Sequence, residues 1–358
     1  MKKIVYIMNV DWNWIKQRPH FIAEGLANTY DMTVVYQFRY GRHKLQKRSH
    51  KGLSVKPIYV IPKISGIARL CWINDHILCR RVKKIIMRTN PDIVYATYPT
   101  HIGMIPPEYS GKVVYDCMDN HAAFQKNEKE RIEMEEMEKN LTNRSTEIMF
   151  SSNYLKSQIC KRYNISEGKT TVIRNAYSGK CLDISDAEYK SSVDKKFHMA
   201  YIGTISSWFD YETIVRALDG MPDATLHIYG PIERIEIPKT DRIIYHGTIE
   251  HNKLYEMIQG MDCLLMPFVV NEIVKAVDPV KIYEYINFNK NIIMCQYDEV
   301  ERFGKFVYFY KNADEFVDAV KKIQSTNVVK YSNDERILFL SENNWDNRIQ
   351  QIIGILER

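Results

Sequence analysis

The segment Asp278-Pro-Val-Lys-Ile-Tyr-Glu-Tyr carries a lysine and a glutamate at a spacing that suits the binding of a phosphorylated ligand. Pro279 favours a first helical turn, and Lys281 and Glu284, three residues apart, then lie on one helix face. A cation in the first turn opposes the helix dipole, and a bound phosphate would resolve that conflict. Glu284 could then accept hydrogen bonds from the two hydroxyls of a ribose. The alternative is a simple surface ion pair between the two side chains.

A second segment, Tyr201-Ile-Gly-Thr-Ile-Ser-Ser-Trp-Phe-Asp, runs from an expected strand into the start of a helix. Gly203 allows the backbone to approach a ligand, and Ser206 or Ser207 can cap the helix. Backbone N–H groups at such a junction suit a phosphate. The same pattern also occurs in plain connections between elements, so it supports a binding site only together with other segments.

Several patterns that carry other chemistry do not occur in the sequence. It contains no Gly-x-Gly-x-x-Gly, Walker loop, Gly-x-Ser-x-Gly or His-Glu-x-x-His. No isolated Asp-x-Asp follows an expected strand, so no metal-held diphosphate is indicated. The seven cysteines form no Cys-x-x-Cys pair and have no zinc-ligand spacing with a histidine. We expect reduced, mostly buried cysteines, no metal ligands and no redox cofactor.

The composition predicts a globular protein of two domains. The chain has 358 residues, of which 45% are hydrophobic and 26% are charged. The longest apolar run, Cys263 to Val270, is far shorter than the roughly 20 residues that cross a bilayer. The apolar run after Met1 is interrupted at Asn9 and Asp11, too early for a signal peptide. We therefore expect a cytoplasmic protein.

The net charge of +6 is unevenly distributed. Between Arg39 and Arg88, fourteen Lys or Arg face one acid, Asp75, which gives +13 there and −7 in the remainder. Apolar residues recur at helical spacing within this window, with basic residues on the other face. We expect basic residues 39–88 to contact an anionic membrane surface or a polyanionic acceptor; the alternative is a solvated helix on a sheet. Nucleic acid is disfavoured because no binding motif accompanies the charge.

Short apolar runs alternate with helical patterns through the first half of the chain. Their continuous hydrophobicity is typical of parallel strands covered on both faces. The expected strands are Ile4–Met8, Thr33–Phe38, Val55–Ile61, Asp92–Tyr98, Val113–Cys117, Glu147–Ser151 and Thr171–Asn175. The expected helices are Pro19–Tyr30, Ala68–Arg88, Gln125–Asn143 and Tyr154–Tyr163.

A polar stretch, Asp183 to Lys196, is the candidate linker, and the alternation then resumes. The expected strands are Met199–Gly203, Thr225–Tyr229, Arg242–His246, Cys263–Pro267, Ile292–Cys295 and Val307–Tyr310. We predict an α/β fold with Rossmann-like domains at 1–185 and 197–345, facing each other across a deep cleft. A C-terminal helix at 346–358 is expected to pack back towards the first domain.

Together these segments resemble the donor domain of a GT-B glycosyltransferase. The resemblance covers most of residues 198–296, in the family's order, and rests on Ile202-Gly-Thr, Leu226-His-Ile-Tyr-Gly-Pro, His246-Gly-Thr-Ile, Met261-Asp-Cys-Leu-Leu-Met-Pro and Pro279-Val-Lys-Ile-Tyr-Glu-Tyr. In the first half, Trp14-Ile-Lys-Gln-Arg-Pro-His and Tyr115-Asp-Cys-Met-Asp are similar to bacterial envelope-polysaccharide glycosyltransferases of the teichuronic-acid and xanthan glucuronosyltransferase type.

The resemblance implies a nucleotide-sugar donor, with UDP as the nucleotide, held by the second domain. It implies an acceptor at the first domain and no required metal or other cofactor. Lys281 would contact the diphosphate and Glu284 the ribose. The full donor set by match is Gly203, Thr204, Gly230, Gly247, Thr248, Ile249, Asp278, Lys281, Tyr283 and Glu284, with 247–249 near the base.

Three positions depart from the family pattern. Ala276 stands where an acid would complete the Glu-x7-Glu pattern of many retaining members, and Thr204 stands where an Arg is usual. Asn289-Lys-Asn replaces the Gly-Lys-Pro that often follows the motif helix. These departures leave the stereochemistry of transfer open.

Transfer with inversion needs a base that takes the proton of the acceptor hydroxyl. The resemblance to xanthan-type enzymes assigns this role to Asp119; the alternative is a helix N-cap. Asp116, nearer the strand, is expected to hold the loop. His101 could polarise the donor sugar or its phosphate, or be a structural hydrogen-bonding group. Arg18 could reach the diphosphate from the first domain, or pair with a nearby acid.

The resulting hypothesis is a hexosyl- or glucuronosyl-transferase that extends a lipid-linked envelope or capsular glycan at the inner face of the plasma membrane. Two alternatives remain. One is a nucleotide-sugar 2-epimerase, which shares the two-domain layout. The other is a catalytically silent GT-B subunit that binds a partner transferase or a polyanion through residues 39–88.

Overall fold

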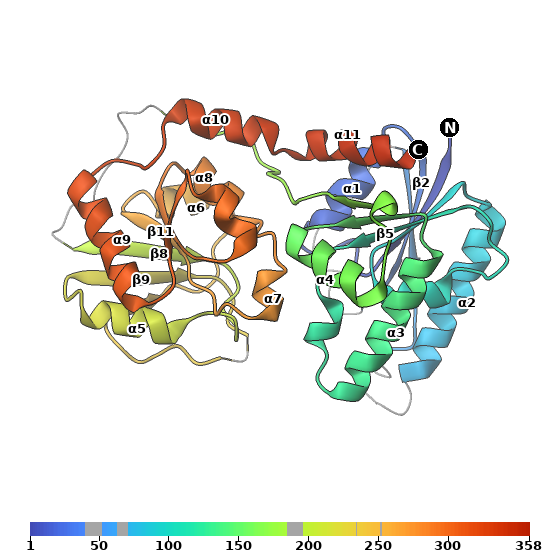
Figure 1. Ribbon diagram of the computed structural model, residues 1–358, viewed down its shortest axis with the longest axis horizontal. Coiled ribbons are helices and arrows are strands. Elements are labelled where there is room, and N and C mark those ends of the chain that lie inside the picture. Colours follow the sequence, from blue (N-terminus) through green and yellow to red (C-terminus); the bar gives the residue numbers. More distant parts are fainter. Residues whose placement is uncertain (40–51, 63–70, 185–195, 234, 251–252) are drawn as a thin grey trace. The chain divides into compact units, whose positions relative to one another are not determined.

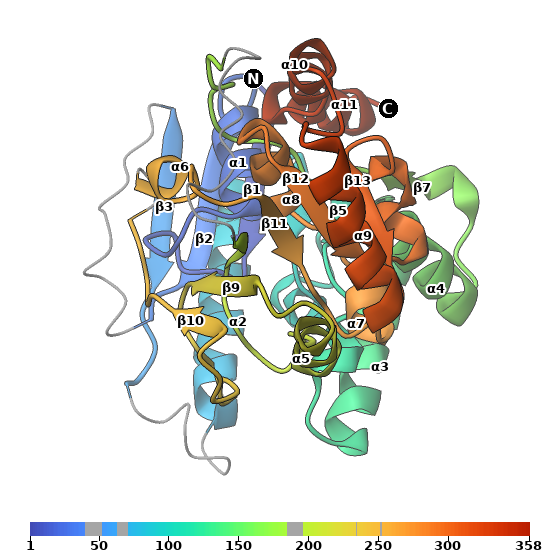
Figure 2. The same ribbon diagram turned by 90° about the vertical axis from the view of Figure 1, so that its left-hand side faces the viewer.

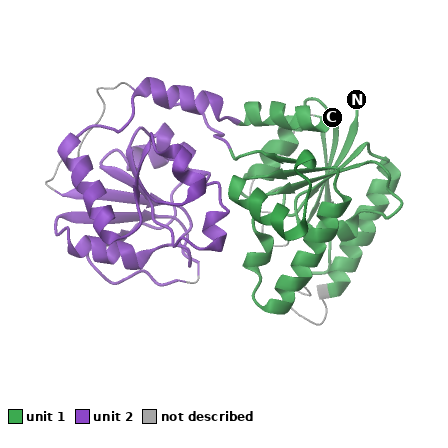
Figure 3. Cartoon of the chain, viewed as in Figure 1, with its two compact units in different colours: residues 1–175, 345–358 green, residues 176–344 purple. Residues whose placement is uncertain are grey.

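The computed structural model describes residues 1–39, 52–62, 71–184, 196–233, 235–250 and 253–358. It divides into two compact units, coloured separately in Figure 3. Unit 1 comprises Met1–Asn175 together with Trp345–Arg358, and unit 2 comprises Ala176–Asn344. The chain therefore passes from one unit to the other twice.

Unit 1 is built on a seven-stranded parallel sheet in the order β3-β2-β1-β4-β5-β6-β7. Strand β1 is central, and its five residues from Ile4 to Met8 are buried. Such continuous burial follows from helices covering both faces of a parallel sheet. The strands are β1 (Lys3–Met8), β2 (Asp31–Gln37), β3 (Leu53–Ile58), β4 (Ile93–Ala96), β5 (Lys112–Cys117), β6 (Glu147–Phe150) and β7 (Thr170–Val172).

The helices of unit 1 include one from the far end of the chain. They are α1 (Arg18–Leu26), α2 (Cys71–Thr89), α3 (Glu128–Arg144), α4 (Asn153–Tyr163) and α11 (Trp345–Leu356), with 3-10 helices η2 (Pro99–Met104), η3 (His121–Phe124) and η4 (Glu167–Lys169). Helix α11 lies along α1, as Figures 1 and 2 both show. The rings of Phe21 and Trp345 stack with centroids 5.1 Å apart. A Cβ on Gly25 would lie 2.4 Å from Ile349 Cγ1, so this glycine permits the close approach.

Unit 2 repeats the architecture with a six-stranded parallel sheet in the order β10-β9-β8-β11-β12-β13. The strands are β8 (Phe197–Ile202), β9 (Ala224–Tyr229), β10 (Ile243–Tyr245), β11 (Cys263–Met266), β12 (Asn291–Cys295) and β13 (Val307–Tyr310). The helices are α5 (Tyr211–Asp219), α6 (Leu254–Met257), α7 (Glu272–Lys275), α8 (Lys281–Asn287), α9 (Ala313–Thr326) and α10 (Asn333–Glu342), with the 3-10 helix η7 (Asp298–Phe303). Helices α5 and α9 pack against each other on one side of the sheet (Figure 1).

The α/β class and the two parallel Rossmann-like sheets agree with the prediction from the sequence. The six cysteines whose side chains are described are all free. None of the described helices combines the length and the apolar character needed to cross a bilayer. Of the basic window 39–88, residues 40–51 and 63–70 lie outside the described part of the chain.

Candidate functional site

Three glycines lie at the carboxyl ends of neighbouring strands in unit 2. Gly203 follows β8, Gly230 follows β9 and Gly247 lies two residues beyond β10. The N–H of Gly203 donates to Tyr229 O at 2.9 Å, and that of Gly230 donates to Gly247 O at 2.8 Å. Gly230 has φ 144°, and a Cβ there would lie 2.0 Å from Gly203 O. Only glycine fits this position, and the three strand ends form one strip of closely approaching backbone.

Helix α8 is tied to the same edge of the sheet by Tyr285. Its hydroxyl accepts a hydrogen bond from Ile202 N at 2.8 Å and lies 3.3 Å from Ile202 O, immediately before Gly203. Lys281, the first residue of α8, and Glu284 lie on this anchored helix. In open α/β sheets ligands bind beyond the carboxyl ends of the strands, where the strand order reverses. That reversal lies between β8 and β11, beside Gly203 and Thr204.

Lys281 and Glu284 form an ion pair in the structure, with 2.7 Å between Nζ and Oε2. The lysine side chain is 39% exposed and the glutamate side chain 13%. The structure therefore shows the surface ion pair that was the alternative. The exposed ammonium group remains available to exchange its partner for a phosphate, so a donor role for both residues remains a prediction.

Two residues of the predicted donor set, Asp278 and Tyr283, have buried side chains, and their contact with a donor stays a prediction. Tyr283 is fully buried and stacks on Phe339. Asp278 is paired with Arg302, which also donates to Tyr283 Oη at 2.9 Å. Together they form an internal cluster that braces the start of α8. From these places they can position Lys281.

The remaining predicted donor residues lie in the loops that follow the strands. Thr204 is half-buried, and its carbonyl accepts a hydrogen bond from Tyr201 Oη at 2.9 Å. Thr248 is exposed and Ile249 is half-buried against the core of unit 2. With Gly247 they lie beyond β10, on the strand-end side of the sheet. The structure thus brings the glycines, these loops and α8 to one edge of unit 2.

In unit 1, Arg18 forms a buried ion pair rather than an open cationic site. Its Nη2 lies 2.8 Å from Asp116 Oδ1, and its Nη1 donates to Ile173 O at 2.7 Å. The guanidinium is thus directed to partners inside unit 1. The structure shows the alternative, a pair with a nearby acid, and a contact of Arg18 with a diphosphate stays a prediction. Asp116 holds α1 to the sheet.

Asp119 lies two residues beyond β5 with a partly buried side chain. The 3-10 helix η3 begins at His121 with Asn120 at the cap position, and no side chain caps it, so Asp119 is not a helix cap. Its carboxylate accepts no hydrogen bond from the described residues. Burial raises the pKa of Asp119; Arg18 lowers it and Asp116 raises it further. A carboxylate with these properties can act as a general base.

His101 follows β4 and is buried. Its Nδ1 accepts a hydrogen bond from Thr97 N at 3.2 Å, so the ring proton is on Nε2. Burial, with the nearby His121, lowers the pKa of His101 to about 3, and burial lowers that of His121 to about 3. Both rings are therefore neutral near pH 7. His101 can donate one hydrogen bond to a ligand and carries no positive charge for a phosphate.

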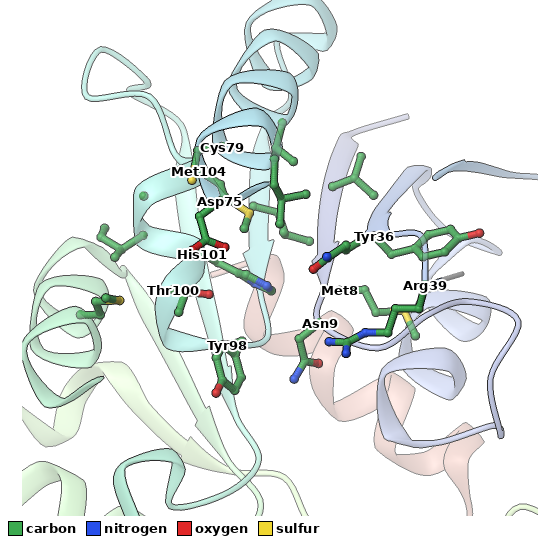
Figure 4. A pocket seen from close by; sticks show the side chains of 18 residues that line it. Met8, Asn9, Tyr36, Arg39, Asp75, Cys79, Tyr98, Thr100, His101 and Met104 are labelled. Carbon is green, nitrogen blue, oxygen red and sulfur yellow. The ribbon is translucent and has the colours of Figure 1, made fainter. Parts of the chain in front are cut away.

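A cavity of about 630 Å³ opens at the carboxyl ends of β1, β2 and β4, where the strand order of unit 1 reverses. Figure 4 shows Thr100 and His101 on one side of it and Asn9 and Arg39 on the other, with their polar groups directed towards one another. The opposite end is apolar. A cavity at this reversal is the expected place for a ligand in an open α/β sheet.

Two features of the candidate site were missed by sequence reasoning. Tyr285 anchors α8 to β8, yet nothing in the sequence distinguishes it from Tyr283 two residues earlier. The cavity collects short segments that lie far apart in the chain, and no local pattern marks them. Among the described residues, no group of three or more His, Cys, Asp or Glu side chains is arranged to hold a metal ion.

Comparison with known proteins identifies similar chains. No protein-family model matches the sequence. The chain is 22% identical over 261 residues to TuaH of Bacillus subtilis (strain 168), which is assigned as a teichuronic acid biosynthesis glycosyltransferase. This match covers 68% of the chain and 66% of TuaH, just under two thirds of that protein's length.

The fold is shared with solved structures along the whole chain. Sucrose-phosphate synthase from Thermosynechococcus elongatus superposes with a TM-score of 0.74 at 11% identity, over 100% of this chain and 98% of that one. HepE from Anabaena, solved in complex with UDP and glucose, superposes with a TM-score of 0.70 at 12% identity, over 100% of both chains. The fold is GT-B, as the resemblance predicted, and the similar proteins are glycosyltransferases of that fold.

Proposed function

We propose that this chain is a glycosyltransferase that transfers a sugar from a nucleoside diphosphate sugar, with UDP as the nucleotide, to a glycan acceptor. The observation that carries the proposal is the strip of backbone at Gly203, Gly230 and Gly247, with α8 anchored beside it through Tyr285. The full-length GT-B fold, the similarity to TuaH and the complex of HepE with UDP and glucose support it.

The proposal gives unit 2 the donor. In the structure Lys281 Nζ pairs with Glu284. A bound diphosphate would take over the ammonium group in a charge-assisted hydrogen bond. Glu284 would then be released to accept hydrogen bonds from the ribose hydroxyls. This exchange explains why a lysine and a glutamate are placed together at the start of one helix.

The proposal gives unit 1 the acceptor and the base. Asp119 takes the proton of the acceptor hydroxyl while that oxygen attacks the anomeric carbon of the donor sugar. The bond from the anomeric carbon to the diphosphate oxygen breaks, and the diphosphate leaves with the electron pair. Lys281 offsets the charge that develops on it. A single displacement of this kind inverts the anomeric configuration.

The proposed mechanism uses no resident metal or other cofactor, since the cationic charge comes from Lys281. Transfer should therefore continue in the presence of EDTA. Loss of transfer in EDTA, with recovery on addition of Mg²⁺ or Mn²⁺, would contradict this part of the proposal.

The finer proposal is that the acceptor belongs to a lipid-linked envelope or capsular glycan and that unit 1 binds the inner face of the plasma membrane. Trp72 at the start of α2 is 63% exposed. Four basic residues of the same helix are also exposed: Arg80, Arg81, Lys84 and Arg88. Nη1 of Arg81 donates a hydrogen bond to Tyr59 O at 2.8 Å. Basic and aromatic side chains exposed together favour an anionic membrane surface. Raised salt should release the protein from anionic vesicles.

The experiment begins with calorimetric titration of UDP and continues with UDP-sugars and a lipid-linked sugar. UDP binding followed by acceptor-dependent product supports the proposal. Conversion of the UDP-sugar without acceptor would replace it with the 2-epimerase hypothesis. Absence of UDP binding would leave the catalytically silent subunit.

A further inference from the structure

We infer that the cavity of unit 1 binds one end of an amphiphilic acceptor, in which an uncharged hydroxylated ring is attached to a hydrocarbon group. The inference rests on the proposed function and deepens it, because it assigns the chemical class of the acceptor. It concerns a cavity that lies wholly within unit 1, at the carboxyl ends of β1, β2 and β4.

One end of the cavity is built for a hydrocarbon. Leu78 and Val82 come from α2, Met104 from the end of η2 and Met137 from α3, and Val35 of β2 lines it as well. No charged or strongly polar group is found among these five side chains. Methionine adapts its shape to flexible apolar ligands, so this end suits an alkyl or prenyl group.

The other end is built for hydroxyl groups. Asn9, Tyr98, Thr100 and His101 line it. The Asn9 carbonyl oxygen Oδ1 is buried and accepts no hydrogen bond from the described residues. A buried acceptor without a donor is costly, and native proteins satisfy nearly all such atoms. A ligand hydroxyl at this place would supply the missing hydrogen bond.

The buried side chains that line the cavity carry no charge. Among the lining residues that the structure describes, Arg39 is the one cation and Asp75 the one anion; both are exposed to solvent, and Figure 4 shows Arg39 beside Asn9 and Asp75 beside His101. Burial lowers the pKa of His101 to about 3, so its ring is uncharged near pH 7. A phosphate or carboxylate at Asn9 has no proton to donate to Oδ1 and would place negative charge against that acceptor oxygen, whereas a hydroxyl donates to it. This favours a neutral ring over a phosphate or a carboxylate.

The polar end lies close to the proposed base. Tyr98 lines the cavity. The Tyr98 ring lies 4.5 Å, centroid to centroid, from that of His121, whose backbone N–H donates to Asp119 O at 2.9 Å. A ring held at Asn9 and Tyr98 would present its hydroxyls on the side of Asp119. The amphiphile is thus oriented with its reactive end towards the base and its hydrocarbon towards α2.

Cys79 provides a direct test, because its side chain lines the apolar end and is partly accessible. The background protein carries Cys71→Ser, Cys160→Ser and Cys181→Ser, and mass spectrometry follows labelling of Cys79 by N-ethylmaleimide. Octyl β-D-glucoside below its micellar concentration should slow labelling at least fivefold. Glucose and octanoate, each at the same concentration, should slow it less than twofold.

Any other pattern of Cys79 protection by the three compounds contradicts a defined part of the inference. Equal protection by octanoate would make the cavity a site for anionic amphiphiles, and equal protection by glucose would remove the role of the hydrocarbon. Protection by none of the three would overturn the site as a whole. The measurement needs no donor, so protection without any transfer would contradict only the proposed function. Transfer without protection would contradict only this inference.

A matched pair of variants tests the polar end. Asn9→Ala removes the buried Oδ1 and should weaken protection by octyl β-D-glucoside at least fivefold. Asn28→Ala, an exposed asparagine after α1, should leave it unchanged. The midpoint of urea unfolding of Asn9→Ala should not fall, since the lost acceptor has no partner among the described residues. Unchanged protection in Asn9→Ala would show that the orphaned atom has no role in binding.

Discussion

The guanidinium of Arg18 and the carboxylate of Asp116 form an ion pair inside unit 1, with Nη2 2.8 Å from Oδ1. The two residues are 98 positions apart in the sequence, and both are almost fully buried. Their pairing joins the start of α1 to β5. Arg18 also donates to Ile173 O, just beyond β7, so one side chain holds three elements together.

Removing one partner of this pair should destabilise unit 1 strongly. Asp116→Asn or Arg18→Met leaves the other charge buried without its counterion, which costs about 3–5 kcal/mol in the free energy of unfolding. Urea unfolding measures the loss. The double variant Arg18→Met with Asp116→Leu should recover much of it. Single variants that cost less than about 1 kcal/mol would show that the pair is not structurally important.

Replacing Lys281 should weaken donor binding and turnover together. Lys281→Ala removes the ammonium group that the proposal places on the diphosphate, and we expect an affinity for UDP at least tenfold lower by calorimetry. Lys275→Ala is the matched control. Lys275 and Glu272 are also three residues apart and form an ion pair on α7, with 3.0 Å between Nζ and Oε1. Equal effects of the two variants would remove the donor role of Lys281.

Asp119→Asn should separate binding from chemistry. The variant retains the shape of the side chain and loses its basicity, so UDP affinity should be unchanged and turnover should fall by about 10²- to 10⁴-fold. Asp31→Asn serves as the control. Asp31 is exposed at the amino end of β2, whereas Asp119 lies beyond the carboxyl end of β5 in the same parallel sheet. Retained turnover in Asp119→Asn would exclude this residue as the base.

Gly230→Ala should destabilise unit 2 and distort the donor edge. Its Cβ would meet Gly203 O at 2.0 Å, at a φ of 144° that alanine rarely adopts. We expect a loss of about 2 kcal/mol or more in unfolding free energy, together with weaker UDP binding. Gly260→Ala, where a Cβ meets nothing within 4 Å, should change neither quantity. A fully stable Gly230→Ala variant would contradict the close approach of the two strand ends.

Unit 1 should lose stability in mild acid because of two buried histidines. Burial lowers the pKa of His101 and of His121 to about 3, whereas an unfolded histidine titrates near 6.5. Between about pH 6.5 and pH 3 the unfolded chain therefore binds more protons at these two histidines than the folded chain does. The free energy of unfolding of unit 1 falls as the pH is lowered through this range. The slope of the free energy of unfolding against pH is at most about 1.4 kcal/mol per pH unit for each histidine.

Urea unfolding between pH 7 and 4.5 measures this dependence. His121→Phe should flatten the curve, because the ring volume stays and the titrating group goes. His76→Gln, at an exposed position of α2, is the control and should follow the parent curve. An unchanged slope in His121→Phe would contradict the assignment.

The strands were predictable because a parallel strand covered on both faces is apolar along its whole length. The expected Cys263–Pro267 and Val307–Tyr310 correspond to β11 (Cys263–Met266) and β13 (Val307–Tyr310). Helix α10 (Asn333–Glu342) was not predicted. Its buried residues are Arg336 and Leu340, and Arg336 donates to Asn287 O at 3.0 Å and to Leu182 O at 2.7 Å. A search for apolar residues at helical spacing counts a buried arginine as polar, so it does not detect this helix.

The candidate site was predictable only where its partners are close in sequence. The three-residue spacing of Lys281 and Glu284 predicted their shared helix face, and the structure places them in contact. No spacing could select Asp116 as the partner of Arg18, because tertiary folding alone brings the two together. The rotation of α8 likewise decides that Tyr283 enters the core while Tyr285 reaches β8.

The return of α11 to unit 1 determines the order in which the chain can be completed on the ribosome. Unit 2 is one continuous stretch, Ala176–Asn344, whereas unit 1 is made from two stretches that flank it. In the folded protein, Trp345 and Ile349 of α11 cover the face of α1 around Phe21 and Gly25. During synthesis this face stays exposed until unit 2 and then α11 have been translated. In genetic terms unit 2 is an insertion within unit 1. It can be excised by two cuts, whereas unit 1 can be obtained alone only by splicing its two stretches together.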